Sequence, residues 1–280
     1  GKGYRLSSPI DLLDSSRIKS LLSEPAKQLV SEVDVFGSVA STNDVAMKHA
    51  EAGGKAGYVC VAEQQTAGRG RRGRPWVSPY GTNIYLSLVW DFYNGASALE
   101  GLSLAVGVAI ASVLKAKGVE GVELKWPNDL LVEGAKLGGI LLEMTGDPSG
   151  HCQVVLGIGI NTSVSKKDGV EIDQAWVDTL TLGVNINRNE LISEIIGELI
   201  SMLTLFSTHG FSYFRDQWLV LDAFKNKAVV VKTGKSDITG VASGVDDTGA
   251  LRLDRAGTIE VIKGGEVSLR LDKLKSSILI

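Results

Sequence analysis

Residues 68–74 read Gly-Arg-Gly-Arg-Arg-Gly-Arg, so four arginines and three glycines occupy seven positions of a chain whose formal net charge is −3. Glycine lets backbone N–H groups approach a ligand closely, and a guanidinium group binds phosphate oxygens in a two-pronged geometry. We predict a loop here, directly after the strand-like run 58–62. A basic loop in a mildly acidic chain indicates a small anionic ligand. Taken alone, the run also fits a solvated loop, a localisation signal or an RNA contact.

Length and composition favour one large and one small domain. The 280 residues are 44% hydrophobic and 22% charged, which supports a full core and argues against wholesale disorder. The slightly negative net charge disfavours broad binding to DNA or membrane surfaces. No signal peptide is recognisable, and no apolar stretch reaches the roughly 18 residues of a membrane span. Cys60 and Cys152 lie in apolar strand-like runs. We therefore expect buried free thiols and a cytoplasmic location.

Hydrophobic periodicity predicts mixed helices and strands as far as residue 221, followed by a small β-rich module. Helices are expected at 10–22, 45–50, 98–117, 187–206 and 213–221, and strands at 32–36, 58–62, 83–90, 122–124, 130–133, 136–144 and 153–160. From Ala228 onward, short β-rich runs alternate with glycine-containing turns, which is typical of a small barrel. The predicted class is α+β.

Three further motifs carry polar or glycine-rich chemistry. Lys125-Trp126-Pro127-Asn128-Asp129 places a cation and a carboxylate beside an aromatic ring, although it also fits an ordinary turn. Asp129 can bind Mg²⁺ or accept a proton. Lys136-Leu137-Gly138-Gly139-Ile140 opens a strand and also fits a hairpin with a surface lysine. The run 157–161, Gly-Ile-Gly-Ile-Asn, lacks the third glycine of a dinucleotide fingerprint, so we interpret it as a strand end that another group approaches closely.

Together these motifs resemble the biotin protein ligase family in order and spacing. The matching segments are Ser41-Thr42-Asn43, Gln65, the arginine-rich run from Gly68, Trp76, the motifs beginning at Lys125 and Lys136, and the run 157–161. The combination of Gly-Arg-Gly-Arg-Arg-Gly with Lys-Trp-Pro-Asn-Asp is highly specific, and the resemblance spans nearly the whole chain. Residues 264–270 resemble the C-terminal module of the bacterial members.

The resemblance implies a class II synthetase-like mixed sheet with helices and a small C-terminal SH3-like β-barrel. Expected domains are a catalytic domain at 7–223 and the β domain at 224–280. Residues 1–6 resemble the last strand of the winged-helix domain found in bifunctional ligase–repressors. We therefore expect the helix-turn-helix itself to be missing from this chain, and operator DNA binding to depend on it.

The resemblance also implies a reaction and its participants. ATP and biotin would form biotinyl-5′-AMP with Mg²⁺, and a lysine of biotin carboxyl carrier protein would then accept the biotinyl group. A ligand-promoted homodimer and a role as repressor of the biotin operon are further family expectations, and no membrane partner is expected.

The family motifs assign roles to individual residues of this chain. The expected catalytic residues are Arg69, Arg71, Lys136 and Asp129, with Asp129 also the candidate metal ligand. The expected biotin-binding residues are Ser41, Thr42, Asn43, Gln65, Arg69, Gly70, Arg71, Lys136, Gly138 and Gly139. The expected nucleotide-binding residues are Arg71, Arg72, Trp76, Asn128, Asn161, Trp176 and Arg270.

Two alternatives compete with this interpretation. Lipoate–protein ligases share the catalytic fold but typically carry an Arg-Arg-x-x-Gly-Gly-Gly pattern, which this chain lacks. A pure nucleic-acid-binding regulator would use the arginine run on phosphates and would bind with steep salt dependence.

Overall fold

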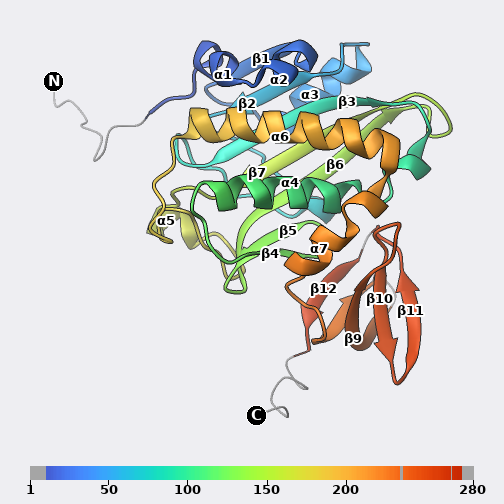
Figure 1. Ribbon diagram of the computed structural model, residues 1–280. Helices are drawn as coiled ribbons and strands as arrows, with labels where there is room; N and C mark the ends of the chain where they lie inside the picture. Colours follow the sequence, from blue (N-terminus) through green and yellow to red (C-terminus); the bar gives the residue numbers. More distant parts are fainter. Residues whose placement is uncertain (1–10, 234–235, 266, 273–280) are drawn as a thin grey trace.

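The computed structural model describes residues 11–233, 236–265 and 267–272. Figure 1 shows a helix-covered sheet in the larger part of the molecule and a second, smaller sheet beside it near the C-terminus. The predicted winged-helix remnant at residues 1–6 lies outside the described residues.

The predicted elements occur in the predicted order with shifted ends, and the short helices Glu24–Leu29 and Lys166–Gly169 are additional. The helices are α1 (Ser15–Leu21), α2 (Glu24–Leu29), α3 (Thr42–Glu51), α4 (Leu102–Ala116), α5 (Lys166–Gly169), α6 (Arg188–His209) and α7 (Arg215–Leu221), with 3₁₀ turns at Arg71–Gly73, Ala96–Leu99 and Phe211–Tyr213. The strands are β1 (Glu32–Phe36), β2 (Tyr58–Ala62), β3 (Ile84–Phe92), β4 (Val122–Lys125), β5 (Asp129–Val132), β6 (Ala135–Gly146), β7 (Cys152–Ile160), β8 (Ala228–Lys232), β9 (Asp237–Val245), β10 (Leu251–Arg255), β11 (Thr258–Ile262) and β12 (Ser268–Leu271).

Within the described residues, seven strands form a mixed sheet in the order β1-β2-β3-β7-β6-β5-β4. The β1–β2 pair is parallel, and the other pairs are antiparallel. The central strands β3, β7 and β6 pair over nine positions each, so the middle of the sheet is its most regular part. Strand β5 pairs with β6 only as far as Gly139, and β6 continues beyond it.

The two faces of this sheet are covered differently. Helices α1, α2, α4 and α6 form one layer with the main hydrophobic core, and α4 and α6 lie in front of the sheet in Figure 1. Helix α3 packs on the opposite face, where Ala46 and Ala50 meet Cys60, Val89 and Val155 in a smaller cluster. Because successive side chains of a strand alternate between faces, the α3 face carries the odd-numbered residues of β3 and β7.

The C-terminal part is an antiparallel sheet in the order β11-β10-β9-β8-β12, five strands among the described residues. The Trp126 indole donates to Gly249 O at 3.0 Å, and Lys263 pairs with Glu100 at 3.0 Å, so both contacts join loops of the larger part to loops of the C-terminal part. The predicted α+β class with a small C-terminal β module is confirmed. The domain limits at 223 and 224 stay a prediction; α7 ends at Leu221 and β8 begins at Ala228.

Several helix ends differ from the periodicity. The expected helix 10–22 starts only at Ser15, after the Asp14 cap, and a second helix with Pro25 in its first turn follows it. The expected start at residue 98 is wrong, because Gly101 takes a left-handed φ of 76° and separates α4 from a 3₁₀ turn. Capping and turn geometry decide these ends, and apolar spacing does not record them.

Two stretches, Ala96–Ala116 and Arg188–His209, are long and apolar enough to cross a membrane by length and composition, contrary to expectation. They contain α4 and α6, which pack against each other and against the sheet. Core packing therefore accounts for their apolar character. The expectation of two buried free thiols is confirmed for Cys60 and Cys152.

A buried ion pair ties the first described residues to the sheet. Arg188 Nη1 lies 2.7 Å from Glu63 Oε2, with side chains only 7% and 4% exposed. The other Glu63 oxygen accepts from Leu13 N at 2.5 Å, and Arg188 also donates to Asp11 O at 2.9 Å. Glu63 directly precedes the segment that leads to the arginine loop, so this pair fixes the base of that loop.

We predict that Arg188→Ala lowers the free energy of unfolding by about 3 kcal/mol, because Glu63 would be left as a buried carboxylate without its cation. Arg17→Ala, which removes an exposed pair with Asp11, serves as the control and should cost less than about 1 kcal/mol. Urea unfolding followed by tryptophan fluorescence measures both. Equal, small losses of unfolding free energy in the two variants would contradict a stabilising role of the buried Arg188–Glu63 pair.

Candidate active site

A cleft lies on the α3 face of the larger sheet, where glycines replace side chains. Its empty volume is about 1040 Å³ including the mouth, and Gly139, Gly157 and Gly159 lie on neighbouring strands of its floor. A Cβ on Gly159 would lie 2.6 Å from the Trp76 ring, and one on Gly157 would collide with the Asn43 amide. The predicted close approach to the run 157–161 is thus confirmed. The glycines make room for these side chains and for a ligand above the sheet.

One end of the cleft is lined by neutral hydrogen-bonding groups. Ser41, Thr42 and Asn43, at the start of α3, are each no more than 3% exposed. Gln65 Oε1 accepts from Thr42 N at 2.9 Å, and Gln65 Nε2 donates to Ser78 Oγ at 3.1 Å. These contacts hold the Gln65 amide in one orientation. This end offers fixed polar groups to a neutral ring.

The other end concentrates positive charge around one carboxylate. Asp129 Oδ2 lies 2.8 Å from Lys125 Nζ, and Asp129 Oδ1 lies 2.6 Å from Lys136 Nζ. Burial alone would raise the pKa of Asp129, but the two ammonium groups lower this pKa from 3.8 to about 2. Burial lowers the pKa of Lys125, and Asp129 opposes that shift. Lys136 Nζ also lies 5.2 Å from the centroid of the Trp76 ring, within cation–π range.

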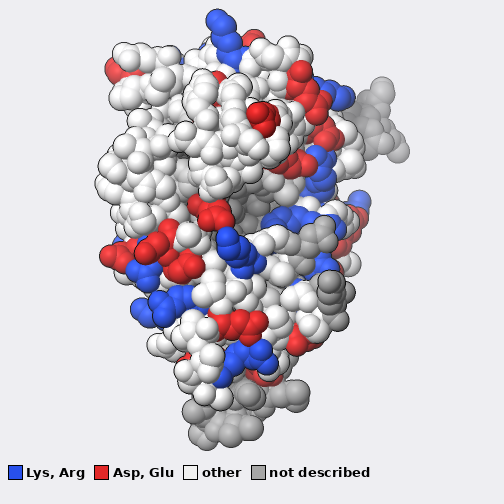
Figure 2. All heavy atoms as spheres, turned by 90° about the vertical axis from the view of Figure 1, so that its right-hand side faces the viewer, with Lys and Arg blue, Asp and Glu red and all other residues white. Residues whose placement is uncertain are grey.

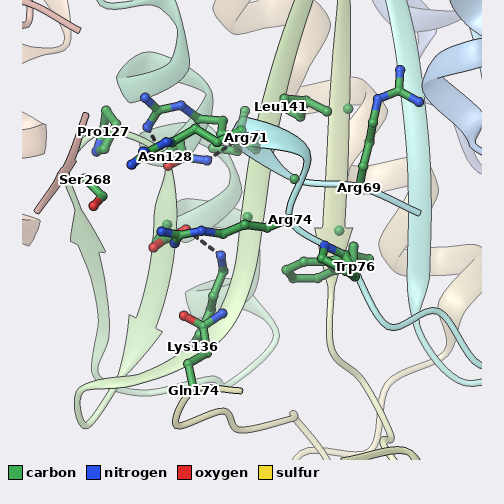
Figure 3. A pocket seen from close by; sticks show the side chains of 18 of the residues that line it. Arg69, Arg71, Arg74, Trp76, Pro127, Asn128, Lys136, Leu141, Gln174 and Ser268 are labelled. Carbon is green, nitrogen blue, oxygen red and sulfur yellow. Dashed lines mark hydrogen bonds and ion pairs between the residues drawn. The ribbon is translucent and has the colours of Figure 1, made fainter. Parts of the chain in front are cut away.

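The loop arginines take two different directions. Figure 3 shows Arg71 and Arg74 extending toward the Asn128 and Lys136 side of the pocket, with Arg69 directed the other way. Arg71 donates to Asn128 Oδ1 and to Val267 O, both at 3.2 Å, and also to Gly265 O. Arg71 therefore joins the arginine loop to the connection between β11 and β12 of the C-terminal part. Burial lowers its pKa.

Arg69 is held by two carboxylates. Its Nη1 lies 2.6 Å from Asp44 Oδ1, and its Nη2 lies 3.0 Å from Glu143 Oε2. Burial opposes the charge, but hydrogen bonds to Glu143 and Asp44 raise the pKa of Arg69 above its ordinary value. In this arrangement the guanidinium anchors the loop to α3 and β6. A direct contact of this side chain with a ligand acid group stays a prediction.

The residues around Asp129 do not form a site for a metal held by the protein alone. Both Asp129 oxygens already accept from lysines, and the described residues contain no group of three His, Cys, Asp or Glu side chains suited to a metal ion. A metal ligand role for Asp129 stays a prediction that this geometry does not favour. Mg²⁺ commonly binds through substrate phosphates and one or two carboxylates, so it would arrive with a nucleotide.

A second cavity adjoins the cleft and shares Trp76 and Lys136 with it. Trp176 lines it and donates its indole N–H to Gly169 O at 3.2 Å. The Asn161 amide donates to Lys136 O and Val177 O, so it supports the loop that carries Trp176. The buried Trp76 Nε1 has no hydrogen-bond partner among the described residues.

Most residues singled out in the sequence meet at these cavities. The cleft is lined by Ser41, Thr42, Asn43, Gln65, Arg69, Gly70, Arg71, Arg72, Trp76, Asn128, Asp129, Lys136, Gly139 and Arg270, and the second cavity by Asn161 and Trp176. Gly138 lines neither; a Cβ there would lie 2.9 Å from Gly159 O, so it serves strand packing. The sequence assigned no role to Lys125, Arg74, Ser87 or Glu143. Lys125 and Arg74 stood inside recognised motifs, whereas strand alternation alone does not single out Ser87 or Glu143.

Comparison with known proteins decides the family. Residues 35–161 match the biotin/lipoate A/B protein ligase family, and residues 225–270 match the biotin protein ligase C-terminal domain. The bifunctional ligase/repressor BirA of Escherichia coli is 40% identical over 270 residues, covering 96% of this chain and 82% of that protein. The chain belongs to the biotin protein ligase family. The biotin--[acetyl-CoA-carboxylase] ligase of Paracoccus denitrificans is 33% identical and covers 81% of this chain and 96% of that protein.

A solved biotin protein ligase also shares the fold. The enzyme from Aquifex aeolicus, solved in complex with biotin and ATP, has a TM-score of 0.74 and 26% identity. The match covers 86% of this chain and all of that chain. The fold expected from the family resemblance is therefore confirmed.

We predict that Asp129→Asn lowers the free energy of unfolding by about 2 kcal/mol at pH 7, the value of a pKa reduced from 3.8 to about 2. Because the pKa is lower in the folded state, this stabilisation is fully present above about pH 4 and is lost as the pH falls through about 2. Urea unfolding of both proteins at a series of pH values measures the difference. A difference in free energy of unfolding that stays constant down to pH 2 would show that the lysine charges do not stabilise the ionised Asp129.

Proposed function

We propose that this protein attaches biotin to a specific lysine of biotin carboxyl carrier protein, using ATP and passing through biotinyl-5′-AMP. The observation that carries the proposal is one continuous cleft with fixed neutral hydrogen-bonding groups at one end and a cluster of cations at the other. Biotin has the same polarity, with a neutral ureido ring joined to a carboxylate by an apolar chain. The relatives named as biotin ligases support the same assignment.

The neutral end suits the ureido ring. Thr42 and Gln65 present groups whose orientation is already set by internal hydrogen bonds. The glycine floor, with Gly139 and Gly159 on adjacent strands, leaves an apolar groove toward the cations. A valeryl chain lying in this groove would carry its carboxylate toward Lys136.

The cationic end addresses the main barrier of the first step. A biotin carboxylate oxygen attacks the α-phosphorus of ATP, a new O–P bond forms, and the bond to the β-phosphate breaks to release pyrophosphate. Two like unit charges about 4 Å apart repel by about 4 kcal/mol at an effective dielectric of ~20. Lys125, Lys136, Arg71 and Arg74 all line the cleft and offset this repulsion. Their charge is in place before the substrates bind.

The second step requires little from the protein beyond positioning. A neutral lysine amine of the carrier attacks the acyl carbon, the new C–N bond replaces the C–O bond to phosphate, and AMP leaves while the amine proton passes to solvent. The loop that carries Arg69 and Arg71 covers the cleft and limits access of water to the anhydride.

We assign the nucleotide to the junction of the two cavities. Trp76 and Lys136 line both cavities, and Trp176 closes the outer one. Arg270 reaches the cleft from β12, so the C-terminal sheet would contact the phosphates. Mg²⁺ would come with the ATP phosphates.

One partner can be inferred from the part of β6 whose outer edge pairs with no other described strand. Residues 141–146 pair with β7 on one side, and no strand pairs with their other side among the described residues. Such an edge accepts a further strand, and we propose that a second copy of the chain docks there.

Figure 2 shows Lys and Arg side chains beside a hollow, with acidic side chains around them. This mixed surface favours a small anionic substrate over nucleic acid, so we place operator binding in another part of the protein. We also propose that the protein works in the cytoplasm, where free thiols persist.

The direct test is ATP-dependent labelling of a carrier domain. We expect biotin to appear on one carrier lysine and pyrophosphate to be released only when ATP and Mg²⁺ are present. Calorimetry should show binding of biotin and much weaker binding of lipoate. Preferential binding of lipoate, or no transfer to the carrier, would disprove the proposed function.

We predict that Arg71→Ala weakens formation or retention of biotinyl-5′-AMP by about 2 kcal/mol or more, the scale of one preorganised charged contact. Pyrophosphate exchange measures formation, and release of labelled intermediate measures retention. Arg255→Ala, on β10 outside both cavities, is the matched control. Unchanged exchange and release in the Arg71 variant would refute the assignment.

A further inference from the structure

We propose that Glu143, Asn43 and Ser87 are positioning residues that force the Thr42 hydroxyl to accept, and not donate, a hydrogen bond in the cleft. They form a chain of contacts that runs from the partly exposed edge of β6, beneath α3, to the neutral end of the cleft, and its Ser87 contacts are buried. The inference rests on the proposed binding of a cyclic urea and adds the physical basis for selecting its N–H group.

The chain begins at a carboxylate that accepts hydrogen bonds. Asn43 Nδ2 lies 2.7 Å from Glu143 Oε2. If the Asn43 amide were turned over, its oxygen would face the Glu143 carboxylate oxygen, and neither atom could donate a hydrogen bond. The NH₂ group of Asn43 must therefore point to Glu143. This short contact, with a longer one of 3.5 Å from Asn43 Nδ2 to Leu141 O, decides the orientation of the Asn43 amide and turns its Oδ1 toward Ser87.

Ser87 fixes the direction of the next hydrogen bond because its hydroxyl group has only one proton to donate. Its Oγ lies 2.6 Å from Asn43 Oδ1 and 2.8 Å from Thr42 Oγ1, and the residue is completely buried. An amide oxygen can only accept, so Ser87 gives its proton to Asn43. In the hydrogen bond between Ser87 and Thr42, the Thr42 hydroxyl must therefore donate and the Ser87 oxygen must accept.

The Thr42 proton therefore points into the protein. Its other internal neighbour, Gln65 Oε1 at 3.2 Å, is also an acceptor and already receives Thr42 N at 2.9 Å. Both internal partners draw the proton away from the cleft. Thr42, which lines the cleft, thus presents a lone pair to the ligand.

An acceptor at this position selects ligands that carry an N–H group. A urea nitrogen donates to it, whereas a ring without N–H groups leaves the buried oxygen without a partner. Sites built to hydrogen-bond a substrate group reject analogues lacking it far more strongly than apolar pockets reject a missing methylene. The chain of contacts thus provides discrimination against a dithiolane ring such as that of lipoate.

Glu143 has a second contact that must be separated from this one. It also holds Arg69, which Asp44 holds as well. Among the described residues, no hydrogen bond joins the side chains of Asp44 and Asn43. Glu143→Ala and Asp44→Ala therefore each remove one carboxylate from Arg69, but only the former removes the short contact that orients the Asn43 amide. Ser87→Ala breaks the chain and leaves both Arg69 contacts in place.

The experiment compares biotin with its two cyclic carbamate analogues, in which one or the other ureido N–H is replaced by an ether oxygen of similar size. Calorimetry on the full 280-residue chain gives each affinity. For the unmodified protein, we expect one carbamate to bind at least about tenfold more weakly than biotin, because two lone pairs then face each other. In Ser87→Ala and Glu143→Ala, only the longer 3.2 Å contact with Gln65 Oε1 still draws the Thr42 proton inward, so the hydroxyl can turn outward and donate, and this ratio should fall. Asp44→Ala should keep it.

Each outcome decides a separate point. A ratio that is unchanged in both Ser87→Ala and Glu143→Ala overturns the inference, and so does an equal fall in Asp44→Ala. Should Ser87→Ala fail to fold, Glu143→Ala at the partly exposed edge of the sheet provides the same measurement. Absence of biotin binding by the unmodified protein disproves the proposed function instead.

Discussion

The shared carboxylate of Asp129 is the interaction on which the cationic end of the cleft depends. Lys125 and Lys136 approach it from the two sides, and their side chains are only 9% and 15% exposed. Two ammonium groups this close in a buried site would repel each other and lose hydration. The carboxylate opposes both effects and holds the two ammonium groups in place without a substrate. Positive potential is thereby a fixed property of the fold.

The glycine residues on the floor of the cleft give a ligand access to these lysines. On the α3 face, Gly139, Gly157 and Gly159 leave space where other residues would place side chains. Asn43 and Trp76 fill part of this space, and the remaining groove joins the neutral end of the cleft to the lysines. Because the flanking strand residues pack into the main core on the opposite face, the groove has a rigid base. Its length and polarity then restrict the ligand.

The sequence predicted the larger elements well because they bury long apolar stripes. Strand β2 and the helix that begins after the Asn187 cap were found from period and capping alone. Helix ends near Gly101 and Ser15 were missed, since they depend on backbone geometry that hydrophobic spacing does not encode. Within the site, the arginine run and the motif from Lys125 were recognisable because they combine rare residue types at short spacing.

The sequence by itself determined that a basic, glycine-rich loop, a Lys-Trp-Pro-Asn-Asp turn and a glycine-containing strand belong to one ligase family, since local composition preserves such motifs. Only the tertiary structure decided which charges face one another. Arg69 is held by Asp44 and Glu143, whereas Arg71 reaches the connection between β11 and β12 of the C-terminal part. Ser87 joins Thr42 and Asn43 from 44 or more positions away. Hydrogen bonds and ion pairs act over a few ångströms, so partners this distant in sequence are defined only once the strands have paired.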